Sequence, residues 1–299
     1  MYKKILITGA KGMLGSILCR TLSPFYSVIA IDKEDCDITD KEKVESFFNK
    51  LSIDVLIHCA AYTEVDKAED EPQKAFLINA QGTKNVIEAL KGKDCFLIYI
   101  STDYVFDGKK PQAYLEADIP NPQGVYAQSK LEGERVISAY TKHAILRTSW
   151  VFGPNGKNFV DTIVRLAKEK EILEVVSDQI GSPTYTLDLS EAIKAMLDIY
   201  FARGLKYGIY HITNSGKCSW FEFAQFIIQL VNLKTVVKPI SSECLHKKAK
   251  RPKNSLLSNE KFHSLAGYCL PSWQEAVKNY LDSIKNNYDY SDYKNNLRD

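Results

Sequence analysis

The chain has 299 residues, of which 45% are hydrophobic and 25% charged, the balance of a soluble globular protein with one large domain or two smaller ones. Its formal net charge of +2 gives no reason to expect a nucleic-acid or membrane partner. No apolar run is long enough to span a bilayer, and the sequence begins with a strand-like segment rather than a signal peptide, so we expect a cytoplasmic protein.

Cysteine and histidine usage points to neither a disulfide framework nor a metal site. The seven cysteines include no Cys-x-x-Cys pair, and several lie in apolar runs, which predicts reduced, structural thiols. The five histidines show no metal-ligand spacing. We therefore expect no metal.

The first predicted unit is a strand, a glycine-rich turn and a helix. Residues 4–8 are a short apolar run typical of a strand buried in a parallel sheet, and residues 13–22 have a helical pattern. Between them, Gly9 would permit a tight turn, Gly12 would let the backbone approach a phosphate, and Gly15 would let helix and strand pack. This context favours a dinucleotide pyrophosphate site over a turn that binds nothing.

A second buried strand is predicted over residues 27–31 and ends at Asp32. An acidic residue about 20 positions beyond the glycines suits the 2′-hydroxyl of an adenosine ribose. Because a carboxylate repels a 2′-phosphate, Asp32 favours NADH over NADPH, while the adjacent Lys33 softens that preference.

The next unit is a helix over 41–51, with Thr39 or Asp40 as N-cap, and a strand over 54–61. The small residues at the end of this strand leave room for a ligand, where open α/β sheets bind. His58 lies inside the apolar strand, and we interpret it as a hydrogen-bonded core histidine rather than a catalyst.

The polar, acidic loop 62–71 is expected to line the mouth of the site. The helix predicted over 72–90 carries Asn79. Its amide either anchors backbone or water near the site or is an ordinary buried amide.

A further apolar strand over 95–100 leads to Thr102, and a helical segment then carries Tyr126 and Lys130. A hydroxyl at the strand end would hydrogen-bond a substrate carbonyl. Tyrosine and lysine four residues apart share one helical face, and a nearby ammonium lowers a tyrosine pKa toward the range of an acid/base catalyst. Alone such a pair often arises by accident, but its order after the glycines and Asp32 makes coincidence implausible. The four alternating strand–helix units predict a doubly wound parallel sheet.

The second half of the chain has less regular signals. Loop 177–184 is either a wall of the substrate site or a surface connection. The basic cluster 247–253 is either a solvated face or, through Arg251, a bidentate phosphate clamp. The predicted elements are strand 144–150, helix 158–168, strand 172–176, helix 187–201, strand 208–212 and helix 220–231, which would complete the ordered part.

These residues resemble a known superfamily. Gly9-x-x-Gly12-x-x-Gly15, the acidic end of the second strand, Thr102, Tyr126 and Lys130 are similar to the extended short-chain dehydrogenases/reductases, and within them most similar to the dTDP-4-dehydrorhamnose reductases, which make dTDP-L-rhamnose. The blocks that carry this resemblance reach to Trp273: His58-Cys-Ala-Ala-Tyr-Thr63, Val65-Asp66, Ala68-Glu69, Ser101-Thr-Asp-Tyr-Val-Phe106, Arg147-Thr-Ser-Trp150, Asn158-Phe-Val160, Asp178-Gln-Ile-Gly-Ser-Pro-Thr184, Cys218-Ser-Trp-Phe221 and Arg251-Pro252.

The resemblance implies an α/β fold with a Rossmann-type doubly wound parallel sheet and a smaller, discontinuous α/β substrate-binding domain. We expect a dinucleotide-binding domain over 1–153. Residues 154–284 would form mainly the substrate-binding domain, with segments that return to the first domain. Residues 285–299 would be a polar, frayed tail.

The resemblance also implies roles. Tyr126 would protonate the sugar C4 oxygen as NADH or NADPH delivers hydride to C4, Lys130 would tune Tyr126 and hold the nicotinamide ribose, and Thr102 would bind the carbonyl. The implied cofactor contacts are Gly9, Lys11, Gly12, Met13, Leu14, Gly15, Asp32, Asp37, Ile38, Cys59, Ala60, Ala61, Tyr62, Asn79, Tyr126 and Lys130. The implied contacts of the dTDP-4-keto-6-deoxy sugar are Val65, Thr102, Asp103, Tyr104, Trp150, Asn158, Gln179 and Arg251, with Arg251 on the diphosphate.

Two departures narrow the chemistry. Nucleotide-sugar 4,6-dehydratases typically place Asp-Glu after the threonine, whereas Thr102 is followed by Asp103-Tyr104, so dehydration is disfavoured. Some reductases of this family bind Mg²⁺ at a dimer contact through an acidic residue just after the third glycine. This chain has Ser16 and Ile17 there, which puts a metal-linked dimer in doubt, so we expect a monomer or a homodimer.

The alternative from another class is a non-catalytic, dinucleotide-binding subunit similar to the regulatory β subunit of methionine adenosyltransferase. Tyr126 and Lys130 are intact, which favours an enzyme. A stable complex with a synthetase, without turnover of any dTDP-ketosugar, would favour the regulatory subunit.

Overall fold

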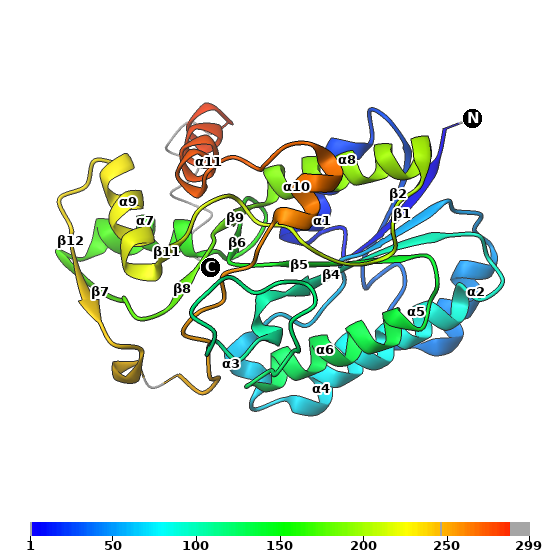
Figure 1. The fold of residues 1–299 in the computed structure, drawn as a ribbon, viewed down its shortest axis with the longest axis horizontal. Helices are drawn as coiled ribbons and strands as arrows, with labels where there is room; N and C mark the ends of the chain where they lie inside the picture. Colours follow the sequence, from blue (N-terminus) through cyan, green and yellow to red (C-terminus); the bar gives the residue numbers. More distant parts are fainter. Residues whose placement is uncertain (1, 246, 288–299) are drawn as a thin grey trace.

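A six-stranded parallel sheet forms the centre of the molecule (Figure 1). This computed structural model describes residues 2–245 and 247–287. The strands lie in the order β10-β5-β4-β3-β1-β2, and neighbouring strands are parallel throughout. Their bounds are β1 (Lys4–Thr8), β2 (Ser27–Ile31), β3 (Val55–His58), β4 (Phe96–Thr102), β5 (His143–Thr148) and β10 (Gly208–His211). The predicted doubly wound parallel sheet is confirmed.

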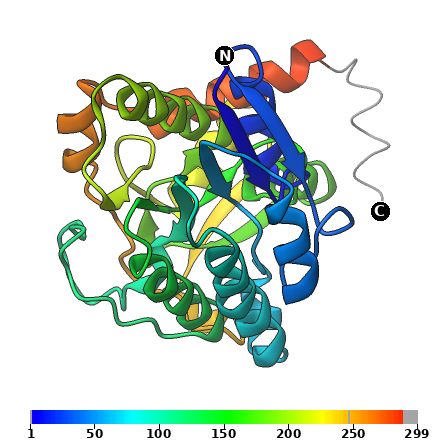
Figure 2. The same ribbon diagram turned by 90° about the vertical axis from the view of Figure 1, so that its right-hand side faces the viewer.

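Helices cover both faces of the sheet because successive strand residues point to opposite faces, and the apolar side chains on each face need a layer to pack against. Ile5 and Ile7 belong to one apolar cluster and Leu6 to another. Figures 1 and 2 show one layer formed by α1 (Met13–Leu22), α8 (Thr186–Arg203) and α10 (Glu260–Ala266). The opposite layer contains α2 (Lys41–Asn49), α4 (Pro72–Phe76), α5 (Thr83–Ala89) and α6 (Val125–Ser138).

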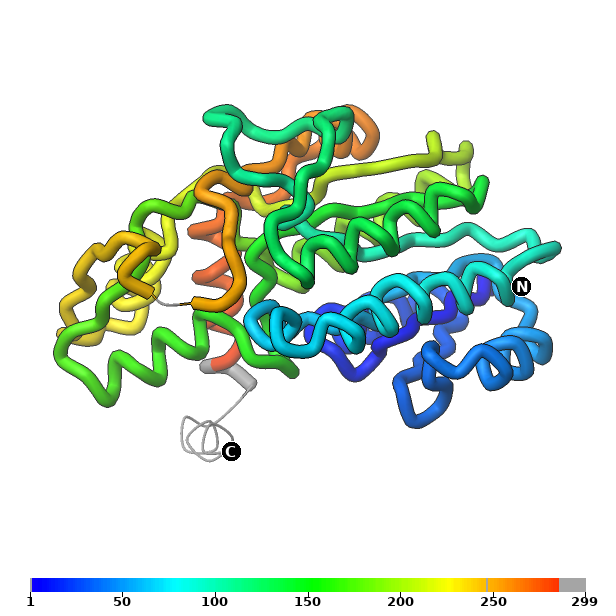
Figure 3. The backbone as a smooth tube through the Cα atoms, turned by 90° about the horizontal axis from the view of Figure 1, so that it is seen from below, coloured from blue at the N-terminus to red at the C-terminus, as the bar shows by residue number. Residues whose placement is uncertain are grey.

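The helix expected over 72–90 is interrupted by a π-helical turn, η1 (Leu77–Gly82), between α4 and α5. In Figure 3 this segment runs alongside α6. The close approach depends on Gly133, where a Cβ would lie 2.2 Å from the Tyr99 hydroxyl and 2.6 Å from the Asn79 carbonyl oxygen. A side chain at Gly133 would therefore push α6 away from the sheet.

A smaller layer with its own core lies beside the sheet (Figure 1). Phe152, Tyr185, Phe223 and Tyr280 are buried there. Its helices are α7 (Phe159–Glu169), α9 (Trp220–Leu230) and α11 (Trp273–Asn287). Its strand pairs are β7 (Ile172–Val176) with β12 (Val236–Ile240), β6 (Val151–Phe152) with β9 (Thr184–Tyr185), and β8 (Ile180–Gly181) with β11 (Cys218–Ser219).

Several predicted boundaries need correction. The strand expected over 144–150 ends at Thr148, because Trp150 has a φ of 47° that no strand residue adopts. Short helical turns, α3 (Val65–Ala68), η2 (Asp103–Val105) and η3 (Ser242–Cys244), occupy segments expected to be irregular or unassigned.

The expectation that the ordered part ends with helix 220–231 was wrong. The described chain continues through β12, α10 and α11. Helix α11 buries Trp273, Val277 and Tyr280 against the smaller core, which is helical spacing. The tail expected from residue 285 is helical as far as Asn287, and residues 288–299 lie outside the described residues.

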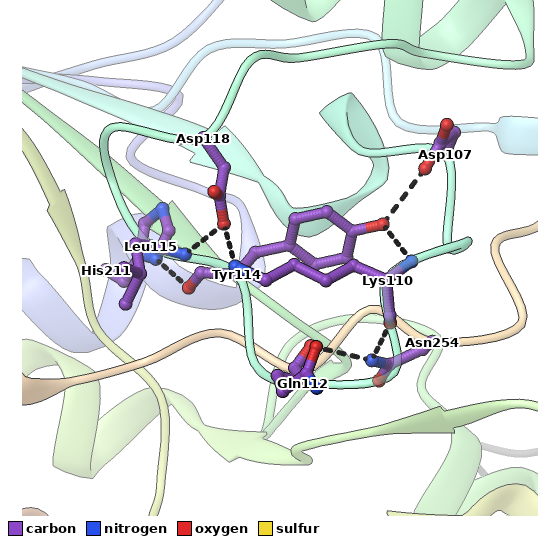
Figure 4. Close-up of polar contacts among 8 residues, drawn as sticks. All are labelled: Asp107, Lys110, Gln112, Tyr114, Leu115, Asp118, His211 and Asn254. Carbon is purple, nitrogen blue, oxygen red and sulfur yellow. Dashed lines mark hydrogen bonds and ion pairs between the residues drawn. The ribbon is translucent and has the colours of Figure 1, made fainter.

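A loop after β4 fastens a later segment of the chain to the end of the sheet (Figure 4). The Tyr114 ring stacks on Phe106, with ring centroids 4.1 Å apart, and the Tyr114 carbonyl meets buried His211 of β10. Asn254 donates to two carbonyls of the same loop. Together with the bridges of Asn254 to Ile180 and of Leu257 to Tyr114, this network holds residues 254–258 between the loop and β8. The residues drawn are Asp107, Lys110, Gln112, Tyr114, Leu115, Asp118, His211 and Asn254.

A buried ion pair joins α6 to the sheet. Arg147 of β5 donates to both carboxylate oxygens of Glu134, over 2.9 Å and 2.7 Å, and the two side chains are only 1% and 4% exposed. The Ser101 hydroxyl donates to the same carboxylate over 2.6 Å. This bidentate contact fixes the helix that carries Tyr126 and Lys130.

We predict that Glu134→Gln destabilises the fold strongly, because it leaves the Arg147 charge buried without a carboxylate. The free energy of unfolding in urea should fall by about 3–5 kcal/mol. The matched control is Glu132→Gln on the exposed face of the same helix, where the pair with Arg135 contributes about 0–1 kcal/mol. Equal effects of the two substitutions would contradict the structural role of the buried pair.

Candidate active site

A cavity of about 1020 Å³ opens at the carboxyl ends of the central strands. This is the edge at which doubly wound sheets bind ligands. The cavity brings together most of the residues expected from the sequence. They are Gly9, Lys11, Gly12, Met13, Leu14, Gly15, Asp32, Asp37, Ile38, Cys59, Ala60, Ala61, Val65, Thr102, Asp103, Tyr104, Tyr126, Lys130 and Trp150.

The glycine-rich turn has the geometry that a dinucleotide pyrophosphate requires. Gly9 has a φ of +66°, and a Cβ there would lie 2.8 Å from the Ala60 nitrogen. A Cβ on Gly15 would lie 2.1 Å from the Gly9 carbonyl oxygen, so Gly15 is needed for helix and strand to pack. Helix α1 has neither a side-chain cap nor an acidic residue in its first turn. Its first amides are therefore available to an anion.

Asp32 lies at the end of β2 among basic residues. Its carboxylate accepts hydrogen bonds from the backbone nitrogens of Lys11 (2.9 Å) and Lys33 (2.8 Å). The Lys11 ammonium pairs with the exposed Glu34 carboxylate over 2.9 Å. Three charged groups that bear on cofactor choice therefore belong to residues that line the cavity: the Asp32 carboxylate and the ammonium groups of Lys11 and Lys33.

Tyr126, Thr102 and Lys130 line the same cavity. Lys130 is buried, donates to the Ile100 carbonyl over 2.7 Å, and lies 4.1 Å from the centre of the Tyr99 ring. Thr102 donates to Asp103 over 3.0 Å and accepts from the Tyr104 backbone nitrogen. Helix α6 therefore supplies Tyr126 and Lys130, and the end of β4 supplies Thr102.

The expected lowering of the tyrosine pKa by Lys130 is not what the structure shows. Desolvation raises the pKa of Tyr126 to about 12, although a hydrogen bond with Thr102 opposes this. Desolvation also lowers the pKa of Lys130 to about 7, against the attraction of Glu134. Removal from water outweighs the mutual electrostatics of the pair, so the neutral phenol is the stable form.

Asp103 is buried next to Thr102. Desolvation raises the pKa of its carboxyl to about 7, even though hydrogen bonds with Ser255 and Thr102 favour the charged form. A carboxyl with this pKa can both accept from and donate to its neighbour near neutral pH. Asp103 is thus poised to change the direction of the hydrogen bond with Thr102.

The loop 177–184 fits neither of the two expected descriptions. It is largely buried, so it is no surface connection, and none of its residues lines the cavity. Instead Gly181 packs on the indole of Trp150, where a Cβ would lie 2.5 Å from Cε2. The loop therefore supports the cavity wall from behind.

Five expected site residues lie outside the cavity lining: Tyr62, Asn79, Asn158, Gln179 and Arg251. Asn79 is buried and bonds the backbone nitrogen and carbonyl of Tyr62, so its amide anchors backbone. Asn158 caps α7 by accepting from the Asp161 nitrogen. Arg251 makes a bidentate pair with Asp66, over 3.0 Å and 2.9 Å.

His58 is confirmed as a core histidine. It is buried and lies 2.7 Å from the Thr8 hydroxyl and 3.2 Å from the Thr83 hydroxyl. Desolvation lowers the pKa of its imidazole to about 3, which keeps the ring neutral.

Other cavity residues were not assigned to the site from the sequence. Thr148 is in register with Thr102 on the neighbouring strand, so a complete strand assignment would have found it. Lys157 and Trp220 come from the smaller layer, and no local pattern places them beside the glycine-rich turn or Trp150. The cavity residues missed in this way include Ser101, Thr148, Ser149, Lys157 and Trp220.

In residues 2–245 and 247–287, no three His, Cys, Asp or Glu side chains gather as metal ligands would. Across the same residues, no helix has the length and apolarity needed to cross a membrane. All seven cysteines are free thiols, of which Cys244 and Cys269 are exposed.

The chain is similar to known proteins over nearly its whole length. The family profile described as RmlD substrate binding domain matches residues 3–286. The spore coat polysaccharide biosynthesis protein SpsK of Bacillus subtilis (strain 168) is 42% identical over 280 residues, which cover 93% of this chain and 96% of that protein. The dTDP-4-dehydrorhamnose reductase of Aggregatibacter actinomycetemcomitans is 41% identical over 286 residues, which cover 92% and 97%.

A solved structure has the same fold. The crystal structure of dTDP-4-dehydrorhamnose reductase from Bacillus anthracis str. Ames, in complex with NADP, matches with a TM-score of 0.90 and 41% sequence identity. The match covers 95% of this chain and 100% of that one.

We predict a pH-dependent stability contribution from Asp103. Its folded pKa of about 7 lies above the unfolded value of about 3.9, so the folded state binds more protons between these values. The contribution of Asp103 to the free energy of unfolding is therefore present at low pH and lost as pH rises to about 7. Relative to Asp103→Asn, the wild type should be more stable near pH 4.5 than near pH 7.5, as measured by urea denaturation.

The control for this measurement is Asp107→Asn. A hydrogen bond from the Lys109 nitrogen lowers the pKa of Asp107, which therefore stays charged across this pH range. Its substitution should change stability by the same amount at both pH values. A wild-type advantage over Asp103→Asn that grew with rising pH would contradict the buried, proton-holding carboxyl.

Proposed function

The chain belongs to the RmlD substrate binding domain family, and from this premise we propose that it is a dTDP-4-dehydrorhamnose reductase, which reduces the C4 keto group of dTDP-4-dehydro-L-rhamnose with NADH or NADPH to give dTDP-L-rhamnose. Relatives at 34–41% identity carry that enzyme name, and one relative was solved with NADP. The observation that carries the proposal is the meeting of Tyr126, Thr102 and Lys130 in one cavity with the glycine-rich turn.

Tyr126 is the proposed proton donor to the C4 oxygen. Reduction of a ketone needs an acid at the carbonyl oxygen, and the acid must hold its proton until the oxygen becomes negative. A pKa of about 12 keeps the phenol protonated at neutral pH. An alkoxide is a stronger base than a phenolate, so the proton transfer remains downhill.

Thr102 is the proposed hydrogen-bond donor to the same carbonyl. Its hydroxyl proton points to Asp103 in the structure, over 3.0 Å. When Asp103 is protonated, its carboxyl donates to the Thr102 oxygen instead, and the Thr102 proton becomes available to the substrate. The Tyr104 nitrogen, which donates to Thr102, completes the contacts of the hydroxyl.

Lys130 is the proposed anchor of the nicotinamide ribose and the electrostatic partner of Tyr126. Its contact with the Ile100 carbonyl fixes the side chain, and the other donors of the amino group remain for ribose hydroxyls. Tyr126 lies one helical turn away. The negative charge of the phenolate would raise the pKa of the Lys130 amine toward its ordinary value. The amine would then take up a proton from solvent.

The glycine-rich end of the cavity fits a dinucleotide. A bound nicotinamide dinucleotide supplies the hydride. The amides of α1 suit the pyrophosphate, and Asp32 suits a ribose 2′-hydroxyl. We propose a preference for NADH because of the Asp32 carboxylate. Lys11 and Lys33 lie beside it and would favour the 2′-phosphate of NADPH.

The substrate would fill the other end of the cavity. We propose that Val65, Tyr104 and Trp150, which line the cavity, contact the sugar. Arg251 remains our proposed ligand of the diphosphate. Its pair with Asp66 uses only part of a guanidinium that has five N–H donors.

The finer organisation is also a proposal. We propose a dinucleotide-binding domain over 1–153 and a mainly substrate-binding segment over 154–284, from which α8, β10 and α10 return to the sheet. We further propose that the protein is cytoplasmic and acts as a monomer or homodimer. The alternative of a regulatory subunit is not favoured, because relatives that match nearly the whole chain are named as reductases.

Tyr126→Phe tests the proposed function. It removes the acid and keeps the ring, so turnover of dTDP-4-dehydro-L-rhamnose, followed by the loss of NADH or NADPH absorbance, should fall by about 10²–10⁴-fold. Cofactor binding, followed by nucleotide fluorescence, should persist. The control is Tyr140→Phe, whose hydroxyl bonds the Cys95 carbonyl away from the cavity. A Tyr126→Phe enzyme as active as the Tyr140→Phe control would refute the role of the phenol.

Asp32→Ser tests the cofactor preference. Without the carboxylate, the ratio of kcat/KM for NADPH over NADH should rise by roughly tenfold, which corresponds to about 1.4 kcal/mol. Lys33→Gln should move the same ratio in the opposite direction, because it removes a charge that attracts the 2′-phosphate. An unchanged ratio in both variants would mean that this end of the cavity does not select the cofactor.

A further inference from the structure

Two tryptophans from opposite halves of the chain stack in the cavity wall. The indoles of Trp150 and Trp220 have ring centroids 3.5 Å apart and an interplanar angle of 7°. Both side chains line the cavity. Trp150 follows β5 of the central sheet, whereas Trp220 is the first residue of α9 in the smaller layer. Both indoles also pack on the smaller core, so the pair joins the segment that follows β5 to the start of α9 at the cavity.

Trp150 is held in a backbone conformation that it would not adopt by itself. Its φ of 47° lies in the left-handed region, which is disfavoured for a residue with a Cβ. Three contacts oppose relaxation. The Thr184 nitrogen donates to the Trp150 carbonyl over 3.2 Å, Gly181 packs on the indole, and Trp220 stacks on it. Strain of this kind persists only where the surroundings fix it, and it gathers at functional sites.

Trp220 is well placed to be the fixed member of the pair. A capping box between Ser219 and Glu222 holds the first turn of α9, with hydrogen bonds of 2.7–3.1 Å. The Phe159 ring lies 4.6 Å from the Trp220 ring, and Phe223 buries the next turn in the smaller core. The smaller layer thus sets the position of Trp220, and the stacked Trp220 ring in turn limits the position of the Trp150 ring.

We propose that Trp220 is a positioning residue for the nucleotide sugar: its stack on Trp150 fixes the strained indole that walls the substrate end of the cavity. This inference rests on the proposed function, since it assigns the substrate end to a nucleotide 6-deoxysugar. Trp220 acts through Trp150, so its loss weakens substrate binding and leaves the glycine-rich, dinucleotide end of the cavity unchanged.

The stack has a spectroscopic signature that needs no substrate. Stacked indoles at this separation couple their transitions, and a rotation of one ring relative to the other within the stack gives an exciton couplet in the circular dichroism spectrum. The chain has three tryptophans, and the third, Trp273, packs on Phe223 and Phe226 away from the cavity lining. Trp220→Leu and Trp220→Phe should abolish the couplet, while the control Trp273→Phe should keep it.

The kinetic test separates positioning from general damage. Trp220→Leu should raise the KM for dTDP-4-dehydro-L-rhamnose by roughly tenfold, about the effect of one lost aromatic contact. The Kd for NADPH should stay within about twofold of wild type, because no dinucleotide contact is removed. Trp220→Phe keeps a ring that can stack, so its KM should lie between those of the wild type and Trp220→Leu. The same variant provides the test if Trp220→Leu fails to fold.

Specific outcomes would overturn the proposal. Loss of the couplet in Trp220→Leu with an unchanged KM would exclude the role of the stack in binding. Equal rises of the KM and of the Kd for NADPH would indicate general damage. If the wild type turns over no substrate, the proposed function fails. Calorimetric titration with dTDP-4-dehydro-L-rhamnose, which carries the sugar, then decides the inference, which requires weaker binding by Trp220→Phe than by Trp273→Phe.

Discussion

The buried pair between Arg147 and Glu134 is the contact on which the site depends. It ties α6 to β5 through two hydrogen bonds, and Ser101 of β4 joins the same carboxylate. Two turns earlier on that helix lies Tyr126, and one turn earlier lies Lys130, whose positive charge Glu134 favours. Because a buried charge cannot lose its partner cheaply, the helix has one stable position on the sheet. The geometry of the proposed acid follows from that position.

Burial of the side chains at the site sets their protonation states. It shifts three neighbouring groups toward their neutral forms, raising the pKa of Tyr126 and Asp103 and lowering that of Lys130. A neutral phenol and a neutral carboxyl are proton donors, which suits the reduction of a ketone. The same desolvation strengthens each hydrogen bond made to an oxygen that becomes negative. Burial thus sets both the protonation states of these groups and the strength of their hydrogen bonds.

The two ends of the cavity are built differently. The dinucleotide end is local, since Gly9, Gly15 and Asp32 lie within the first strand–helix–strand unit. The substrate end is assembled from distant segments, where Trp150 is held by Gly181 and Trp220. Arg251, from a later segment, is held by its pair with Asp66 of α3. A change of substrate could therefore evolve in the smaller layer without disturbing the cofactor.

The sequence by itself determined the parallel sheet, the glycine-rich turn and the triad of Thr102, Tyr126 and Lys130, because these follow from short-range patterns with a physical requirement at each position. It did not determine the pKa values. The spacing of Tyr126 and Lys130 on one helix predicts that Lys130 lowers the pKa of Tyr126. Burial, a property of the packed molecule, raises that pKa instead. Only the tertiary structure decided the Trp150–Trp220 stack, since no local pattern records a contact between segments that meet by folding.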